Sequence, residues 1–413
     1  MRYWLLGSLV MASSAMALDV KNSVTADYET NWFFADGNQT YRTDNSVALE
    51  SESIFSWQDG QQRLSIKPFY RVDERDTQRT HGDIREFIWH QVAENYELMA
   101  GIGKVFWGVT ESQHLVDIIN QTDLVEKIDG EEKLGQPMVQ LLLEREWGNL
   151  DLFVLPYQRE RTFAGEKSRL LGALPLADAR YQSAEKEKHT DIAGRWYHYV
   201  DELEMAVSYF QGTSREPALG LEVNGVGQQK LLAYYPLIRQ TGLELQYLHE
   251  GWAWKLEGIY RSGMPRNNLS GGAAVLSSPL GTQVAKAQDY WATTAGFEYT
   301  QVGVFESRTD LGWVAEHLYD SRQDEAAVGA GEHDVLLATR WTFNDEDDST
   351  LLAGVLYDYD YQDYSLSVEG SKRLGESLKA ELEMRFFDVQ DKDNATYVLR
   401  NEDFARLTFS YYY

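Results

Sequence analysis

The chain of 413 residues carries 65 Asp and Glu against 38 Lys and Arg, a formal charge of −27, and it contains no cysteine. This charge argues against nucleic acid as a partner, because the phosphates would be repelled. A disordered chain is also excluded, since 43% of the residues are hydrophobic and 13% are aromatic. Without disulfides, the fold has to rest on packing and hydrogen bonds alone.

The first predicted element is a secretory signal peptide at residues 1–17, MRYWLLGSLVMASSAMA. It begins with a positive charge, continues as a short apolar run and ends on an Ala-x-Ala cleavage site. The apolar run is too short to span a bilayer, and no later stretch holds about 18 apolar residues, so no transmembrane helix is expected. No Pro/Gly/Ser-rich linker divides residues 18–413, which we therefore expect to share one architecture.

Strict alternation of apolar and polar residues runs through the mature chain, for example at 64–72, 202–209 and 378–386. In 378–386 the residues Leu378, Ala380, Leu382, Met384 and Phe386 share one face, and the residues Lys379, Glu381, Glu383 and Arg385 share the other. This alternation predicts β-strands with one apolar and one polar face. Segment 84–91 (IREFIWHQ) alternates less cleanly, so its facing stays unassigned.

Short and long connections join the predicted strands in turn. Short connections are expected at 59–60, 94–95, 148–149, 201–202, 250–251, 301–303, 344–348 and 373–376. Long connections are expected near 35–43, 75–81, 108–136, 158–188, 213–232, 263–288, 319–332 and 390–401, with a short one at 362–363 on the same side. The count gives about 18 strands (16–18) of roughly ten residues, the length of a transmembrane strand.

Two architectures explain such strands: a soluble β-sandwich that buries its apolar face, and a transmembrane barrel that exposes it to lipid. The barrel is favoured by tryptophans near the strand ends, where membrane-interface girdles lie. These are Trp32, Trp57, Trp107, Trp147, Trp196, Trp252, Trp254, Trp291, Trp313 and Trp341. Closure also removes the sheet edges that lipid does not tolerate. The predicted fold is therefore an all-β, transmembrane antiparallel β-barrel.

The chain closes on RLTFSYYY (406–413), an alternating strand with Leu407, Phe409, Tyr411 and Tyr413 on one face. This ending resembles that of Gram-negative outer-membrane β-barrels of the porin type, whose terminal aromatic residues are read by the barrel-assembly machinery. Phe409, Tyr411 and Tyr413 match that assembly signal, although a glycine often found a few residues earlier is absent. The resemblance implies a barrel in the outer membrane, with lipid, lipopolysaccharide and the assembly machinery as partners.

The third outer connection, 108–136, is long and dense in carboxylates. In porins the third outer loop folds into the lumen and narrows it, so the resemblance implies an inward-folded third loop here. Its segment 111–119 fits a short helix, with Leu115, Ile118 and Ile119 on one side. The candidate constriction residues are Glu111, Asp117, Asp123, Glu126 and Asp129 of the loop, with Lys67 and Arg71 on the preceding strands. Opposed charges across a gap would orient polar solutes, whereas a solvated surface loop is the alternative.

The predicted lumen is acidic, because inward acids outnumber inward bases roughly two to one. Carboxylate rings favour cations, so the predicted function is passive diffusion of small hydrophilic solutes through a cation-preferring channel. A non-conducting receptor or scaffold barrel and an outer-membrane barrel hydrolase are the alternatives. An enzyme is not expected, since the eight histidines are scattered and neither Gly-x-Ser-x-Gly nor His-Glu-x-x-His occurs. No cofactor or metal is expected.

The fourth outer connection begins with a basic stretch, QRERTFAGEKSR (158–169). Its Arg159, Arg161, Lys167 and Arg169 would suit lipopolysaccharide phosphates or an anionic solute. Alternatively, these bases only offset the acids beside them. The sequence leaves monomer and homotrimer open, because lipid-facing and subunit-facing residues look alike.

Overall fold

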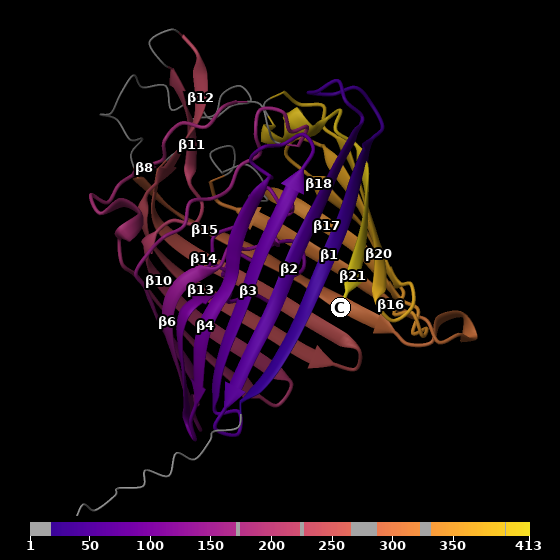
Figure 1. Ribbon diagram of the computed structural model, residues 1–413. Helices are drawn as coiled ribbons and strands as arrows, with labels where there is room; N and C mark the ends of the chain where they lie inside the picture. Colours follow the sequence, from indigo (N-terminus) through magenta and orange to yellow (C-terminus); the bar gives the residue numbers. More distant parts are fainter. Residues whose placement is uncertain (1–17, 171–173, 224–226, 266–286, 323–331, 393) are drawn as a thin grey trace, which may run out of the picture.

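A computed structural model describes residues 18–170, 174–223, 227–265, 287–322, 332–392 and 394–413, so the expected signal peptide at 1–17 lies outside the described residues. Eighteen strands form one sheet (Figure 1). They are β1 (Asp19–Phe33), β2 (Thr43–Trp57), β3 (Gln62–Asp73), β4 (His81–Val92), β5 (Tyr96–Gly103), β6 (Gln136–Arg145), β7 (Gly148–Leu155), β9 (Asp191–Val200), β10 (Leu203–Thr213), β13 (Leu237–His249), β14 (Trp252–Pro265), β15 (Ala287–Gln301), β16 (Asp310–Asp320), β17 (His333–Thr342), β18 (Thr350–Asp358), β19 (Tyr364–Arg373), β20 (Leu378–Asp388) and β21 (Phe404–Tyr412).

The sheet closes on itself, because β1 pairs antiparallel with β2 on one side and with β21 on the other. The prediction of about 18 antiparallel strands in a barrel is confirmed. Short turns lie at one end and the long connections at the other, where Figure 1 shows the additional strands standing above the barrel. These are β8 (Arg180–Tyr181), β11 (Ala218–Val223) and β12 (Gln229–Tyr235), which form a small sheet that the sequence interpretation treated as loop.

Short 3-10 helices complete the described elements. They are η1 (Lys186–Lys188), η2 (Val304–Glu306) and η4 (Ala395–Leu399). None of the helices among the described residues has the length and apolar character needed to span a bilayer.

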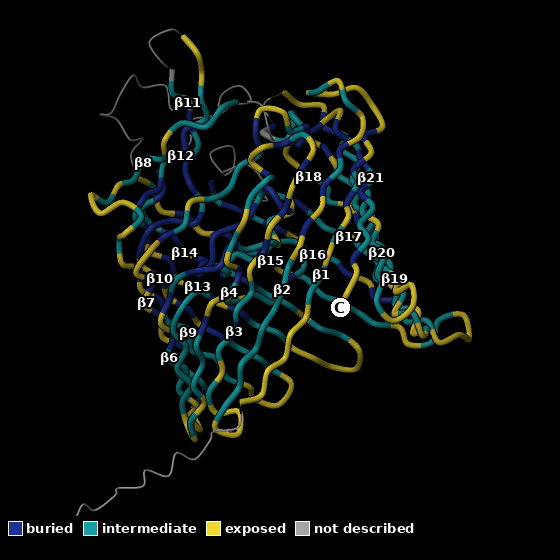
Figure 2. Tube along the Cα trace, in the orientation of Figure 1, coloured by how far each residue is buried: buried dark blue, intermediate teal, exposed yellow. Residues whose placement is uncertain are grey.

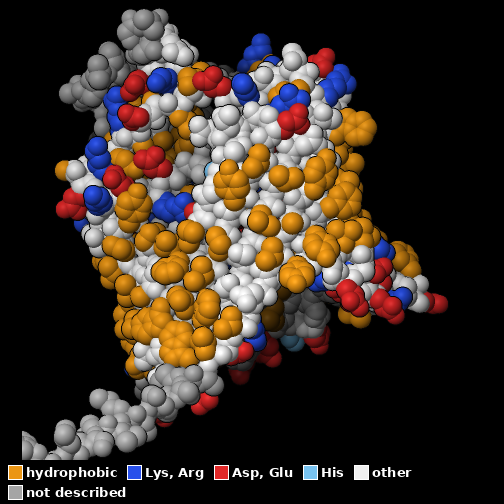
Figure 3. All heavy atoms as spheres, viewed as in Figure 1, with side chains coloured by type: hydrophobic (Ala, Val, Ile, Leu, Met, Phe, Trp, Pro, Cys, Tyr) orange, Lys and Arg blue, Asp and Glu red, His pale blue; other side chains and the backbone are white. Residues whose placement is uncertain are grey.

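The strands present apolar side chains outward, as their alternation predicts. On β3, Tyr70 and Val72 are exposed, whereas Ser65 and Arg71 are buried inside the barrel. Figure 3 shows hydrophobic side chains across the middle of the visible face and charged side chains along its rims. A barrel surface of this kind suits a hydrocarbon layer with water on both sides.

The unassigned facing of segment 84–91 has a structural cause. Pairing between β3 and β4 shifts register at a β-bulge between Lys67 and Pro68, so that Lys67 pairs with Glu86 and Pro68 pairs with Ile84. The extra residue, Arg85, is buried inside the barrel. A bulge inserts one residue into the alternation and therefore breaks the period of two.

Part of the barrel interior is apolar, which the expected polar lumen did not include. The third outer loop brings Val116, Ile118 and Ile119 against inward-facing Phe153 and Phe210 of β7 and β10. Figure 2 shows buried residues mainly in the upper, loop-bearing part of the barrel. Apolar inward residues are stable there because the loop removes them from water.

Two local predictions are wrong. Trp107 is 2% exposed and lies in the apolar interior, not in an interface girdle. Segment 111–119 is not helical. The backbone N–H groups of Glu111 and Ser112 donate to the carboxylate of Glu316 on β16, so that the chain bonds to the barrel wall in place of a helical turn.

Candidate pore and its constriction

The third outer loop, residues 104–135 between β5 and β6, crosses the barrel interior. The backbone N–H of Thr110 donates to Glu257 Oε1 on β14 at 3.0 Å, and that of Ser112 donates to Glu316 Oε2 on β16 at 2.8 Å. Around the ring, β14 lies five strands and β16 seven strands from β6. Because hydrogen bonds are short-ranged, the loop reaches these strands through the lumen.

Two of the predicted constriction residues are held in ion pairs on the wall. Glu111 accepts from Lys255 Nζ at 2.7 Å and from Arg340 Nη2 at 2.6 Å. Lys67 lies 3.0 Å from Glu50 Oε1. Both charges are therefore partly neutralised by a counter-charge on the wall.

Two further predicted carboxylates are buried. Asp123 accepts from Arg85 Nη1 at 3.1 Å and from the Thr162 hydroxyl at 2.7 Å, and its side chain is 0% exposed. The Asp117 side chain is 1% exposed and lies 3.3 Å from Lys133 Nζ. Burial raises the pKa of Asp117. Both carboxylates therefore hold the loop together and face no open passage.

The remaining predicted residues lie beside open space. Arg71 Nη2 lies 2.9 Å from Glu126 Oε2, and Asp129 Oδ2 lies 3.3 Å from Arg385 Nη2. Of the predicted constriction set, Arg71, Glu126 and Asp129 line a chamber among the described residues, and Lys67, Glu111, Asp117 and Asp123 do not.

The chamber, of about 590 Å³, lies between residues 126–132 of the loop and the inner wall of the barrel. Nine carboxylates line it, against five Arg and Lys side chains. The carboxylates are Asp27, Glu29, Glu50, Glu126, Asp129, Glu132, Glu369, Glu381 and Glu383, and the bases are Arg71, Arg85, Lys127, Arg340 and Arg406. Arg85 was missed because of the bulge, whereas the alternation of the last strand already placed Arg406 on its polar face.

The outer connections next to loop residues 126–129 are held together by an apolar cluster and a buried ion pair. Leu170 and Leu399 from two outer connections pack with Phe33 of β1, and Ile128 of the third loop packs against them. Beside this cluster, Arg169 Nε donates to Glu402 Oε2 at 2.6 Å, with side-chain exposures of 0% and 1%. We name this ion pair the outer latch.

The outer latch ties three outer connections together. Arg169 also donates to the backbone oxygens of Tyr41 at 2.8 Å and Ala35 at 3.0 Å. The guanidinium lies 4.3 Å from the centroid of the Phe33 ring. Arg169 thus joins the connection before β2 to the one before β21.

The basic stretch at 158–169 is therefore not a patch on the outer surface. Arg159 pairs with Asp83 at 2.8 Å, and Arg169 is buried in the outer latch. Arg161 is only partly exposed and donates to Gln121, whereas Lys167 is exposed. Most of these charges serve contacts within the protein.

One group of carboxylates has the spacing of a cation site. Oxygen atoms of Asp129, Glu369 and Glu383 lie within 4.8 Å of one another. Arg385 donates to all three, at 3.3, 2.8 and 2.8 Å. The guanidinium supplies the positive charge that this cluster needs, so no metal site is assigned.

The residues of the assembly signal lie on the closing strand. Tyr411 and Tyr413 are 52% and 88% exposed, and Phe409 is partly exposed. The backbone of Tyr413 exchanges two hydrogen bonds of 2.9 Å with that of Val24, at the seam between β21 and β1. The aromatic rings are therefore accessible at the end with the short turns.

These features define a porin-like β-barrel fold: a closed sheet, an apolar outer surface, short turns at one end and a loop through the lumen. No protein-family model matches the sequence, and no curated protein matches it. A BenF-like porin from Pseudomonas fluorescens Pf-5 matches the structure with a TM-score of 0.56 at 10% identity, over 96% of this chain and 98% of that chain.

Two other solved structures are similar. Wzi of Escherichia coli, a carbohydrate-binding barrel involved in group 1 capsule assembly, gives a TM-score of 0.50 at 12% identity, over 94% of this chain and 83% of its own. OmpT of Vibrio cholerae in its trimer form gives a TM-score of 0.47 at 11% identity, over 96% of this chain and 100% of that chain. At these identities the similarity concerns the fold.

Proposed function

We propose that the protein is a channel of the Gram-negative outer membrane for passive diffusion of small hydrophilic solutes, with a preference for cations. The observation that carries this proposal is the chamber beside the third outer loop, where nine carboxylates face five bases. In a confined and partly dehydrated space, such charges act more strongly on a solute than in bulk water.

We assign the cation preference to three carboxylates that line the chamber, Asp27, Asp129 and Glu381. Asp129 also pairs with Arg385 at 3.3 Å and Glu381 with Lys379 at 2.6 Å, whereas no ion pair of Asp27 occurs among the described residues. The buried carboxylates Asp117 and Asp123 are left out, because their side chains are 1% and 0% exposed. Neutralising those two would test the folding of the loop and not the charge of the passage.

The test is a reversal-potential measurement in planar bilayers under a potassium chloride gradient. The wild type should favour K⁺, and the variant Asp27→Asn/Asp129→Asn/Glu381→Gln should shift toward Cl⁻. Glu250→Gln is the matched control, since this turn residue has a side chain 84% exposed. Liposome swelling with sugars, amino acids and organic acids would then rank the solutes. A conducting triple variant with unchanged selectivity would contradict the assignment.

A second candidate function is a non-conducting receptor or scaffold barrel. The observation that favours it is the close packing of the outer connections through the outer latch and the apolar cluster around Leu170 and Leu399. Single-channel recording separates the two functions. Regular conductance steps support the channel, and their absence from correctly folded protein supports the scaffold.

Partners and processing belong to the same proposal. We propose residues 1–17 as a cleaved signal peptide and residues 18–413 as the barrel, in contact with lipid, lipopolysaccharide and the assembly machinery. N-terminal sequencing of protein from outer membranes tests the cleavage site. Chemical cross-linking in intact membranes tests whether the protein is a homotrimer.

A further inference from the structure

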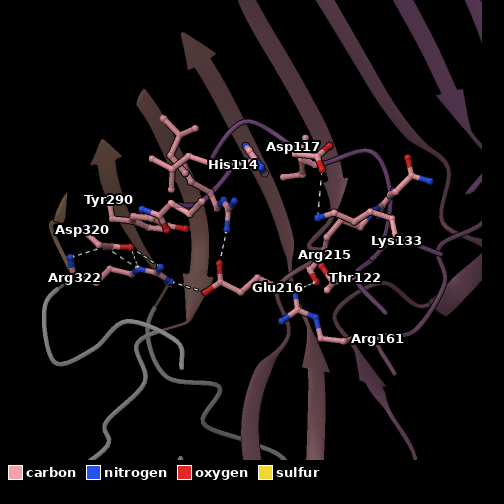
Figure 4. A pocket seen from close by; sticks show the side chains of 16 residues that line it. His114, Asp117, Thr122, Lys133, Arg161, Arg215, Glu216, Tyr290, Asp320 and Arg322 are labelled. Carbon is pink, nitrogen blue, oxygen red and sulfur yellow. Dashed lines mark hydrogen bonds and ion pairs between the residues drawn. The ribbon is translucent and has the colours of Figure 1, made fainter. Parts of the chain in front are cut away.

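A second cavity, of about 200 Å³, is lined by a different stretch of the third outer loop (Figure 4). Loop residues 113–122 line this cavity, whereas residues 126–132 of the same loop line the chamber. We name the cavity the basic recess. Its charged lining consists of Lys133, Arg161, Arg215, Arg261 and Arg322 against Asp117, Glu216 and Asp320. Positive charge exceeds negative charge there, the reverse of the chamber.

Arg215 supplies a donor without a protein acceptor. The residue is 4% exposed, and its Nε and Nη1 donate to Ile119 O at 3.1 Å and Asp191 Oδ2 at 2.8 Å. Among the described residues, its buried Nη2 has no hydrogen-bond partner. A buried charged donor without an acceptor is costly, so the site favours a ligand that supplies an oxygen.

Arg161 supplies a second charge that is not neutralised by an ion pair. Its Nε and Nη2 donate to Gln121 Oε1 at 3.2 Å and Arg215 O at 2.9 Å, both neutral acceptors. Within the described part of the chain, no carboxylate forms an ion pair with it. Burial lowers the pKa of Arg161, as expected for a guanidinium whose charge is poorly compensated.

The opposite wall of the basic recess is preorganised. Glu216 bridges Arg261 Nη1 at 2.7 Å and Arg322 Nη1 at 2.8 Å, and Arg322 lies 3.9 Å from the centroid of the Tyr290 ring. Burial alone would raise the pKa of Glu216, but the two arginines lower this pKa to about 2. The bridge therefore persists at neutral pH. A wall held in this way loses little conformational entropy when a ligand binds.

The basic recess has an apolar floor. Ile118, Ile259 and Tyr290 line it and belong to the apolar cluster that fills this part of the barrel. Ile118 and Ile259 offer an ion no hydrogen-bond partner, so an ion in the basic recess is held by its arginines. This geometry suits binding better than transit.

We propose that the basic recess is a binding site for a small oxyanion, a carboxylate or phosphate group, held by Arg161 and Arg215. Guanidinium groups match such oxygens in shape and charge. The site goes beyond the proposed channel function, and a binding measurement on detergent-folded protein tests it whether or not the barrel conducts.

The probes are inorganic phosphate and acetate, titrated against chloride at constant ionic strength, with binding followed by equilibrium dialysis. At least one anion should bind, and Arg161→Gln should weaken that binding at least tenfold. Arg161→Gln is preferred to Arg215→Gln, which would leave Asp191 without its arginine partner. Arg400→Gln is the control, since Arg400 is an exposed arginine beside Tyr397. It should bind like the wild type.

A second arm distinguishes free anions from lipid phosphates. Lipopolysaccharide is added to the phosphate titration: competition would identify a lipid phosphate as the source, and its absence would identify a free anion. Both results support an oxyanion site. The proposal is overturned if neither probe binds, or if Arg161→Gln binds as tightly as the wild type.

Discussion

Leu382 and Glu381 are neighbours in β20 whose side chains face opposite surroundings. Leu382 is an exposed apolar side chain, at 38%, whereas the Glu381 side chain pairs with Lys379 of the same polar face at 2.6 Å. Leu382→Arg should cost about 2–4 kcal/mol, the cost of a cation in the lipid-facing middle of a barrel strand. Unfolding by urea in vesicles measures this loss. Glu381→Arg should fold normally and shift the reversal potential toward anions. Equal stability of the two variants would show that the facing of β20 is wrong.

His114 introduces a pH dependence at the third outer loop. Its Nε2 lies 3.4 Å from Glu131 and its Nδ1 lies 3.8 Å from Glu257. Burial alone would lower the pKa of His114, but the two carboxylates raise it from 6.5 to about 10. A raised folded-state pKa gives stability that is complete below the unfolded pKa and is lost as the pH rises through the folded one.

The wild-type barrel should therefore lose unfolding free energy, measured by urea, between pH 7 and about 10.5, relative to His114→Gln. The control His249→Gln changes the last residue of β13, whose side chain is 55% exposed, and it should follow the wild type. If the free energy of unfolding depended on pH in the same way in the wild type and in His114→Gln, the ion pairs at His114 would be contradicted.

At the scale of elements, the third outer loop depends on Glu257 of β14. Glu257 Oε1 accepts from the backbone N–H of Val109 and Thr110 and from the Thr110 hydroxyl, at 2.7, 3.0 and 2.7 Å. Glu257→Ala would leave buried N–H groups unpaired, at about 1–3 kcal/mol each. The loop should then detach from β14, and single-channel conductance should rise and become noisier.

The matched control for Glu257→Ala is Glu244→Ala. Glu244 is another buried wall carboxylate, and it pairs with Arg195 at 2.7 Å. It should alter stability without raising conductance. A correctly folded Glu257→Ala barrel with wild-type conductance would show that this anchor does not control the passage.

The outer latch should hold the outer connections together. Arg169→Ala leaves the Glu402 carboxylate buried and unpaired, a loss of about 3–5 kcal/mol in the stability of the loop assembly. The outer connections should become sensitive to protease added to intact membranes, and conductance should increase. Arg42→Ala removes the exposed pair with Asp36, worth about 0–1 kcal/mol, and should change neither property. Identical protease resistance of both variants would rule out a latch.

At the scale of the whole molecule, closure of the barrel depends on the last strand. Deleting Tyr413 removes an exposed side chain and two backbone hydrogen bonds to Val24, a small part of the seam between β21 and β1. We therefore expect a large loss of outer-membrane yield and a small change in the stability of protein refolded in vitro. Normal yield after the deletion would contradict the role of the terminal aromatic residues in assembly.

The sequence predicted the interior less completely than the wall. Alternation placed wall carboxylates such as Glu383 inward, which is correct, and treated them as charges of an acidic lumen. Glu257 and Glu316 instead accept backbone N–H groups of the third outer loop, and Glu383 pairs with Arg385. A period of two reports which face a side chain lies on and carries no information about its partner across the lumen.

The sequence by itself determined the barrel: the approximate number of strands, the facing of the strands without a bulge and which end carries the long connections. It could do so because lipid demands an apolar side chain at nearly every second position of each strand. This alternation can be recognised within each short segment of the sequence. Only the tertiary structure decided which inward charges are paired and which line open space. Partners such as Arg169 and Glu402 are 233 residues apart, and folding alone brings them together. The division of the lumen into an acidic chamber and a basic recess rests on such long-range contacts, for which no local pattern exists.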